Sequence, residues 1–251
     1  MPACRKVLSA PVAALALVTL ILSAFACYCY AQSLPERFGE RAIDRKEAPE
    51  DVPPIWTLDF RFKDPRVVTV NVPGRGLRHV WYLWYQVSND TGEPRLFVPE
   101  FVWVCHDTMT SHMDLVIPKA QTKIQSVEDP TNLLDIKNSV SITQAPIPFI
   151  KQFDNKGQRI AFPKLITGVA MWDDIPAKCF NYSIYVYGLS DGWRMIDGPD
   201  GRPIVRRKAL RLQFKRLGDE FKFASEQVRF VRYEWVYGTQ ELPLQKPHQG
   251  P

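Results

Sequence analysis

Apolar and polar side chains alternate along most of the chain between residues 55 and 237. The alternation is clear over residues 56–62, where Trp56, Leu58, Phe60 and Phe62 are spaced two apart. The same period recurs at residues 67–72, 79–88, 95–105, 164–172, 179–189, 204–215 and 227–237, and a shorter stretch at 139–144 also fits a strand. Successive side chains of a strand lie on opposite faces of a sheet, so the pattern predicts many short strands.

Residues 117–127 are the one stretch with helical spacing, because Ile117, Ala120, Ile124 and Val127 fall on one face of a helix. Hydrophobic residues make up 45% of the chain and charged residues 24%, which is the composition of a folded globular domain. Turn-forming residues separate the strands, as at 89–92. These features predict an all-β fold: an antiparallel, immunoglobulin-like β-sandwich with one short helix in a connection. A small closed barrel is the alternative.

The N-terminus has the pattern of an export signal. Arg5 and Lys6 precede an almost wholly apolar stretch at residues 7–26. Residues 29–31 place small side chains at the −3 and −1 positions of a cleavage before Gln32, which predicts a signal peptide over residues 1–31. Two alternatives remain open, a retained membrane anchor and a poor lipoprotein signal at residues 24–27. We expect an exported protein, periplasmic or secreted, with an N-terminal membrane anchor if the signal is not cleaved.

Composition divides the rest of the chain into three parts. Residues 32–54 are rich in proline and charge and predict a linker, residues 55–238 form the predicted β-sandwich domain, and residues 239–251 predict a disordered tail. The net charge of +5 falls to +3 once Arg5 and Lys6 leave with the signal. So weak an excess of positive charge, together with export, argues against nucleic acid as a partner.

Several short blocks carry a resemblance to other proteins. They are 64–66 (DPR), 72–76 (VPGRG), 80–87 (VWYLWYQV), 91–95 (TGEPR), 204–208 (IVRRK) and 214–219 (FKRLGD). With these blocks the chain resembles a family of uncharacterised exported bacterial proteins, and the similarity covers most of the predicted domain. The resemblance implies export and a compact domain, and it implies no activity. More loosely, a strand that ends in Asn89-x-Thr91-Gly92 is similar to strands of immunoglobulin-like envelope domains.

Two cysteines, Cys105 and Cys179, remain after the signal. In an oxidising compartment they can form a disulfide, and two separate buried thiols are the alternative. Soft-metal ligands also cluster here: Cys105, His106, Met109, His112 and Met113. Thiolate, thioether and imidazole select copper(I), so copper binding is one hypothesis, and a packed turn after a strand is the other. A disulfide at Cys105 would exclude the copper site, because it removes the thiolate.

Aromatic side chains are expected on the outer faces of two strands. Tyr82 and Trp84 share one face of the 79–88 strand, and Tyr185 and Tyr187 share one face of the 179–189 strand. If the strands are neighbours, the four rings form a flat binding surface for sugar rings or a protein partner. The alternative is that loops or the helix cover them. Basic residues follow at 202–216, either on a solvated strand face or in contact with an anionic envelope polymer or lipid headgroups.

Sequence motifs of catalysis are weak in this chain. Residues 188–192 match G-x-S-x-G, but a nucleophile elbow needs a helix directly after Ser190, and none is predicted. The sequence has no phosphate loop, zinc-ligand pairs or dinucleotide fingerprint, so no cofactor is predicted. The leading hypothesis is a non-catalytic envelope protein that binds a protein partner or a polysaccharide. A copper-binding protein and a hydrolase with a site assembled from distant residues are the alternatives.

Overall fold

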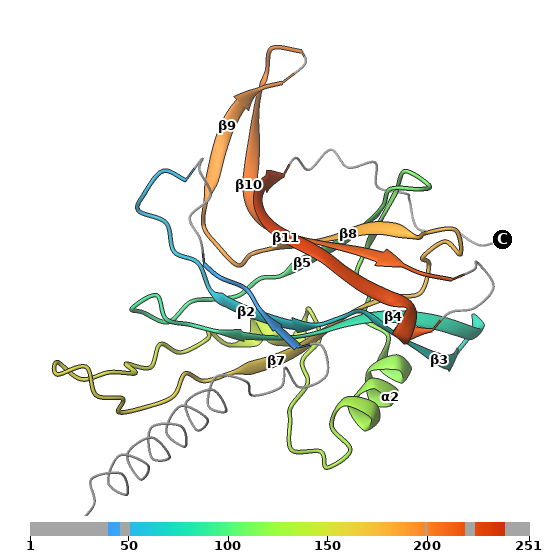
Figure 1. Cartoon of the computed structure of the whole chain (residues 1–251), viewed down its shortest axis with the longest axis horizontal. Coiled ribbons are helices and arrows are strands. Elements are labelled where there is room, and N and C mark those ends of the chain that lie inside the picture. The colour runs from blue at the N-terminus through green and yellow to red at the C-terminus, as the bar shows by residue number, and fades with distance from the viewer. Residues whose placement is uncertain (1–39, 46–50, 199, 219–223, 239–251) are drawn as a thin grey trace, which may run out of the picture. The chain divides into compact units, whose positions relative to one another are not determined.

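The computed structural model describes residues 40–45, 51–198, 200–218 and 224–238, which belong to one folded unit (Figure 1). The predicted signal peptide and C-terminal tail lie outside these residues. The strands are β1 (Glu40–Ala42), β2 (Asp59–Lys63), β3 (Arg66–Val72), β4 (Gly76–Ser88), β5 (Glu100–Cys105), β6 (Thr110–Met113), β7 (Ile166–Trp172), β8 (Asn181–Tyr187), β9 (Trp193–Asp197), β10 (Pro203–Arg216) and β11 (Val228–Gly238). One α-helix, α2 (Pro118–Glu128), lies in the described part of the chain. The predicted all-β sandwich with a single helix in a connection is confirmed.

Each of the two antiparallel sheets is built around one long strand. In the β4 sheet, β3 pairs with the first half of β4 and β2 pairs with its last residues. Strand β7 pairs with residues 81–87 of β4, and β1 pairs with β2. Tyr82 pairs with both Arg66 and Met171, which places β7 on the opposite edge of β4 from β3. In the β10 sheet the order is β11-β10-β8-β5-β6, and β9 pairs with the first residues of β10. The β9–β10 hairpin extends beyond the rest of the sheet (Figure 1).

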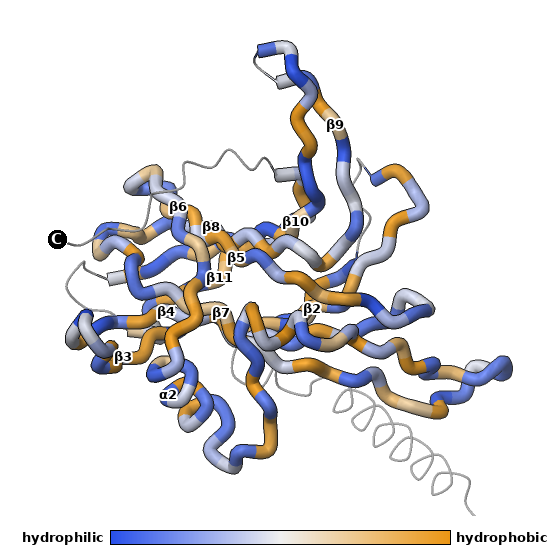
Figure 2. The backbone as a smooth tube through the Cα atoms, turned by 180° about the vertical axis from the view of Figure 1, so that it is seen from behind, coloured by the Kyte–Doolittle hydropathy of each residue, from blue (hydrophilic) through white to orange (hydrophobic). Residues whose placement is uncertain are grey.

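The main core lies between the two sheets. Alternate residues of β4 supply Trp81, Leu83 and Tyr85 to it, and alternate residues of β8 supply Tyr182 and Ile184. The rings of Trp103 and Tyr182 stack with their centroids 4.1 Å apart. Hydrophobic and hydrophilic residues therefore alternate along the strands, as Figure 2 shows. Burial of one face of each strand follows directly from the two-residue period of the sequence.

A second core lies on the outer face of the β4 sheet, under α2. Ala120 and Ile124 of the helix pack on Val80, Tyr82 and Trp84 of β4. Because β4 is covered on both faces, it is apolar at nearly every position from Val80 to Tyr85.

Some boundaries differ from those predicted. The predicted 32–54 linker contains β1, and Ile43 directly after it is buried in the main core. The predicted 139–144 strand is instead a 3-10 helix, η2 (Ser141–Gln144). Asn138 explains the difference, because its side-chain oxygen accepts hydrogen bonds from the backbone N–H groups of Val140 and Ser141 and favours a turn. The short strands β6 and β9 were not predicted. Within the described residues, no helix has the length and hydrophobicity needed to span a bilayer.

Candidate functional site

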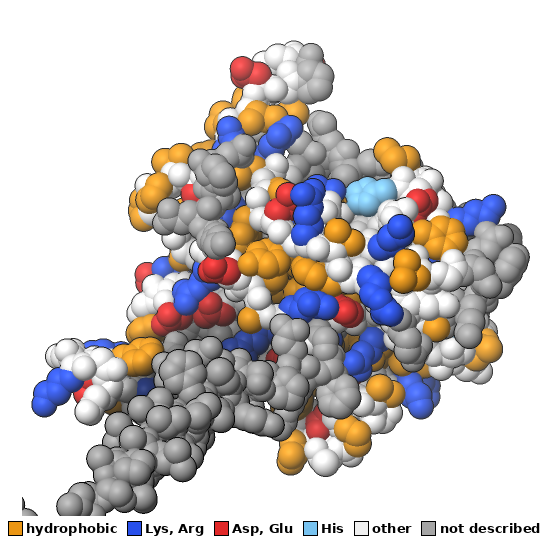
Figure 3. Space-filling model, viewed as in Figure 1, with side chains coloured by type: hydrophobic (Ala, Val, Ile, Leu, Met, Phe, Trp, Pro, Cys, Tyr) orange, Lys and Arg blue, Asp and Glu red, His pale blue; other side chains and the backbone are white. Residues whose placement is uncertain are grey.

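The outer face of the β10 sheet carries aromatic and basic side chains from neighbouring strands. Tyr185 of β8 pairs with Arg211 of β10, and Tyr187 pairs with Ala209. Arg207 precedes Ala209 by two residues on β10, so it lies on the same face as Ala209. Basic side chains lie across the face of the molecule in view in Figure 3, many of them beside hydrophobic ones. The alternation that builds the core thus also gathers Tyr and Arg on the opposite face.

A pocket of about 250 Å³ opens on this face. We call it the outer-face pocket; its lining residues are Tyr185, Tyr187, Arg206, Arg211, Val236, Tyr237 and Gly238. The absence of a side chain at Gly238 leaves room for Tyr187, because a Cβ there would lie 2.4 Å from the Tyr187 hydroxyl oxygen. Burial raises the pKa of Tyr187 to about 12, and it also raises the pKa of Tyr185. Both phenols are therefore neutral hydrogen-bonding groups at physiological pH.

Two of the nearby arginines are held in place by carboxylates and aromatic rings. Arg211 donates to Glu234 at 2.8 Å and stacks over Tyr185, with 5.7 Å from its guanidinium carbon to the ring centroid. Arg207 pairs with Glu100 at 2.5 Å and stacks over Tyr187 at 4.8 Å. A guanidinium over an aromatic face gains cation–π attraction and loses rotational freedom, so both groups are preorganised.

Arg206 differs from its two neighbours. Among the described residues its guanidinium has no hydrogen-bond or ion-pair partner, whereas Arg207, whose Nε is likewise buried without a partner, pairs with Glu100. A buried N–H without a partner is costly, and an unpaired guanidinium on a pocket wall binds a carboxylate or phosphate with two parallel hydrogen bonds. Arg206 is therefore a lining residue of the pocket whose positive charge no described carboxylate balances.

A histidine and a serine meet beside this pocket. His106 Nε2 lies 2.8 Å from Ser183 Oγ, and Arg211 donates to the same oxygen at 3.2 Å. Burial, followed by the charge of Arg211, lowers the pKa of His106, so the ring is neutral at pH 7. A serine–histidine contact is the geometry of an activated nucleophile. However, Ser183 is fully buried, so its hydroxyl fixes Arg211 and His106 and is not open to a substrate.

Comparisons with models of protein families, with curated proteins and with solved structures found no match to this chain.

The four predicted aromatic residues are not on one surface. Tyr82 and Trp84 lie on the β4 sheet beneath α2, where they are 1% and 4% exposed. Tyr185 and Tyr187 lie on the outer face of the β10 sheet and line the outer-face pocket, where Tyr185 is half-buried and Tyr187 is 3% exposed. The predicted flat surface of four rings is therefore not assembled, because the helix covers half of it. Sequence reasoning did not single out Tyr237 for this pocket, and it placed Arg206 only within a general basic stretch.

The predicted soft-metal ligands lie apart from one another. Cys105 forms a disulfide with Cys179, with the two Cα atoms 5.6 Å apart. His106 contacts Ser183, whereas His112 is buried and contacts Asp174 at 2.8 Å. Met113 pairs across the sheet with Val102 and His112 with Trp103, which places these two ligands on opposite faces of β6. Met109 is 75% exposed at the turn before β6. The pairing of Cys105 favours the first of the two predicted states of the cysteines and removes the thiolate from the set.

The G-x-S-x-G segment leads into a strand. The Ser190 hydroxyl donates to the Trp56 carbonyl at 2.7 Å, and β9 begins three residues later. The expectation that this motif lacks the helix of a nucleophile elbow is thus confirmed.

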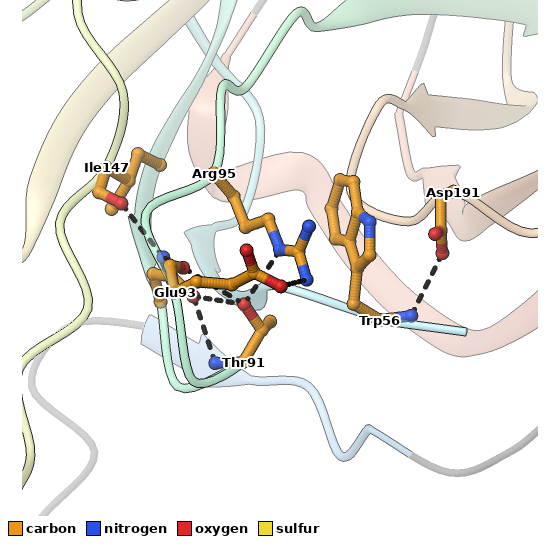
Figure 4. A network of polar contacts seen from close by, with 7 residues as sticks. Trp56, Thr91, Glu93, Arg95, Ile147 and Asp191 are labelled. Atoms are coloured by element: carbon orange, nitrogen blue, oxygen red, sulfur yellow. Dashed lines mark hydrogen bonds and ion pairs between the residues drawn. The ribbon is translucent and has the colours of Figure 1, made fainter. Parts of the chain in front are cut away.

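Trp56 belongs to a second pocket, of about 330 Å³, that Lys208 and Asp51 also line. Figure 4 shows its polar contacts: Arg95 donates to Thr91, pairs with Glu93 and lies over the Trp56 ring. Lys208 and Asp51 form a buried ion pair, and Tyr237 donates to Asp51 at 2.7 Å. Arg45, also on the lining, pairs with Asp59 and Asp90. The cations in and around this Trp56 pocket are therefore all neutralised by described carboxylates, in contrast to Arg206.

Proposed function

We propose that the protein is an exported, non-catalytic envelope protein that binds an acidic polysaccharide at the outer-face pocket. The observation that carries the proposal is Arg206, a lining residue of the outer-face pocket with Tyr185 and Tyr187, whose guanidinium has no partner among the described residues. A binding site gains orientation and specificity from a few polar groups in an aromatic lining.

The chemistry of the lining favours an acidic sugar. A carboxylate accepts two parallel hydrogen bonds from a planar guanidinium, and Arg206 is the group available to donate them. Tyrosine combines ring area with a polar hydroxyl, a combination that suits the mixed apolar and polar surface of a sugar. The pocket is small, so we expect it to take one acidic sugar while the adjoining units of the polymer lie along the strands. Arg207 and Arg211 stand beside it, preorganised on their tyrosines.

Support for export comes from two features. The basic and apolar pattern of residues 1–31 is that of a signal peptide. The Cys105–Cys179 disulfide is of a kind that persists in oxidising compartments. An exported protein meets polysaccharides of the envelope, and it does not meet nucleic acid.

A binding measurement on one variant and its control tests the proposal. We expect the protein to bind oligomers of galacturonic acid by calorimetry and to bind neutral glucose oligomers of the same length much more weakly. Arg206→Gln should weaken binding of the acidic oligomer about tenfold or more, since a charge-assisted hydrogen-bonded pair is lost. Arg232→Gln is the control, because Arg232 lies on β11 of the same sheet with its side chain 62% exposed. Equal binding of acidic and neutral oligomers, or equal losses in the two variants, would contradict the proposal.

A further inference from the structure

A hairpin projects from the connection between η2 and β7. We call residues 150–164 the basic hairpin; it is the yellow-green hairpin at the left of Figure 1. Phe153 and Arg159 pair across it, and the backbone N–H of Asp154 donates to the Gln158 carbonyl at 2.9 Å. The Asp154 carboxylate accepts hydrogen bonds from the backbone N–H groups of Lys156 and Gln158, both at 2.8 Å. The turn is therefore a defined structure fixed by its own aspartate.

Large apolar side chains of this hairpin are exposed to solvent. Phe162 is 74% exposed, Ile160 59% and Phe153 45%. The Arg159 guanidinium lies between the two phenylalanines, 4.8 Å from the Phe153 ring centroid and 5.1 Å from that of Phe162. Hydrophobic and hydrophilic residues alternate along the same hairpin in Figure 2. Exposed aromatic side chains on a projecting element are typical of a contact surface.

The basic hairpin has a net positive charge. It carries Lys151, Lys156, Arg159 and Lys164 against the single acidic residue Asp154, a net charge of +3. None of the four cations has an ion-pair partner among the described residues, although Lys151 donates a hydrogen bond to Asn155, and the Asp154 carboxylate is occupied by the turn. The hairpin therefore presents apolar groups together with uncompensated positive charge.

We propose that the basic hairpin docks the protein on an anionic lipid surface, with Phe153, Ile160 and Phe162 in the headgroup layer and the four basic side chains on lipid phosphates. Amphipathic segments with aromatic and basic residues bind membranes in this way. A stable protein–protein interface needs about 800 Å² from each partner, which is more than a narrow hairpin with three exposed apolar side chains offers. A lipid surface requires only shallow insertion, and each nearby Lys or Arg strengthens binding to an anionic leaflet about fivefold.

Vesicle cosedimentation of the full chain tests whether the basic hairpin docks on an anionic lipid surface. The probes are vesicles of phosphatidylcholine alone and of an equal mixture of phosphatidylcholine and phosphatidylglycerol, and the quantity is the ratio of the two partition coefficients. The N-terminal segment, with Arg5 and Lys6, is the same in every variant, so differences in this ratio between variants report on the hairpin. The wild type should prefer the anionic vesicles, and the preference should fall at high salt. Lys151→Gln/Lys156→Gln/Lys164→Gln should lower the preference about 100-fold, since three charges are removed.

A second pair of variants separates the apolar contribution from the charge. Phe153→Ser/Phe162→Ser should weaken binding to the anionic vesicles about tenfold or more, because the double variant lacks the two rings that insert into the headgroup layer. Leu77→Ser/Met195→Ser is the matched control, since these side chains are 73% and 57% exposed on other strands, and it should bind like the wild type. No preference of the wild type for anionic vesicles, or equal losses in the hairpin and control variants, would overturn the proposal. A hairpin that instead binds a protein would leave vesicle partition unchanged in both variants.

Discussion

The outer faces of the two sheets start from the same sequence pattern and end in different environments. Tyr82 and Trp84 of β4 and Tyr185 and Tyr187 of β8 are all outward-facing aromatics at alternate positions. On the β4 sheet α2 covers the pair, and the nearby carboxylate of Glu128 accepts hydrogen bonds from Lys63, Arg66 and Tyr82. On the β10 sheet the aromatic pair lies beneath arginines and borders a pocket, with Tyr185 half-buried and Tyr187 3% exposed.

The two outer faces differ in whether their charged side chains have partners. Glu128 has a side chain only 1% exposed, and it receives two cations and a phenol. A charge that is removed from water must be paired and hydrogen-bonded in this way. The outer-face pocket leaves the Arg206 guanidinium without a described partner, which is tolerable only where water or a ligand can reach it. The face under α2 thus pairs its buried charge, whereas the β10 face leaves Arg206 without a described partner, and this is the group that the proposed binding uses.

Removing one aromatic ring from each face should give the largest contrast. Trp84→Ala should lower the free energy of unfolding by about 4 kcal/mol, because it leaves a cavity between β4 and α2. Tyr185→Ala should cost about 1 kcal/mol, since this ring is only partly buried, and it should weaken binding of the acidic oligomer. Chemical denaturation measures the first quantity and calorimetry the second. Similar losses of stability in the two variants would mean that the faces are equally closed.

Neutralising one carboxylate on each face is the next contrast. Glu128→Gln should lower the free energy of unfolding by about 3 kcal/mol, because Lys63 and Arg66 lose their shared partner. Glu234→Gln should cost less than about 1 kcal/mol, since Glu234 is 33% exposed and pairs with Arg211 near the surface. Both can be measured by urea unfolding at neutral pH, where a large effect at Glu234 would contradict the comparison.

The pH dependence of the Glu128 variant sharpens this test. Burial opposes ionisation of Glu128, but hydrogen bonds from Lys63 and Tyr82 and the charge of Arg66 outweigh it, so the pKa lies below its usual value of 4.5. A lowered folded-state pKa stabilises the fold above the unfolded-state pKa, and this contribution is lost as the pH falls through the folded-state pKa. The gap between wild type and Glu128→Gln should therefore be widest at neutral pH and narrow below about pH 4.5. A gap that stays constant in acid would contradict the assignment.

The sequence predicted the strands and the helix where their periodicity was long. It predicted β4, β10 and α2 nearly at their observed bounds, because each has several apolar residues on one buried face. It missed β9, whose side chains Trp193 and Met195 are exposed on a projecting hairpin and give no core-facing signal. It placed β1 in a linker, since three residues are too few to show a period. Local side-chain hydrogen bonds at Asn138 replaced the predicted 139–144 strand.

The candidate site was predictable only in part, for a related reason. Alternation shows that Tyr82, Trp84, Tyr185 and Tyr187 face outward, but it does not say which sheet face a helix will cover. The ion pairs of the outer face are also invisible in sequence, because Glu100 lies 107 residues from Arg207 and Glu234 lies 23 residues from Arg211. Arg206 cannot be distinguished from its paired neighbours until those contacts are known.

The smallest expected difference comes from adding one methyl group beside a tyrosine of the main core and one beside a tyrosine of the outer-face pocket. At Gly168 of β7 a Cβ would lie 2.3 Å from the ring of Tyr85, which is fully buried between the sheets and packs on Phe60 and Phe101. The ring has nowhere to move, so Gly168→Ala should cost about 2 kcal/mol of stability through overpacking. At Gly238 the added Cβ would meet the hydroxyl end of Tyr187 on the pocket wall. Tyr187 is 3% exposed but borders the outer-face pocket, so we expect its ring to shift into the pocket and Gly238→Ala to cost less than about 1 kcal/mol.

The affinity for galacturonic acid oligomers shows whether Gly238→Ala alters the pocket. A Tyr187 ring displaced into the outer-face pocket occupies the space beside Arg206, so Gly238→Ala should weaken binding of galacturonic acid oligomers severalfold, while Gly168→Ala should leave their affinity unchanged in the folded protein. Thermal unfolding and calorimetry on the same two samples give both numbers. If Gly238→Ala destabilises the protein as much as Gly168→Ala and leaves the affinity unchanged, Tyr187 is held as rigidly as Tyr85. The pocket wall would then be packed as firmly as the main core between the sheets.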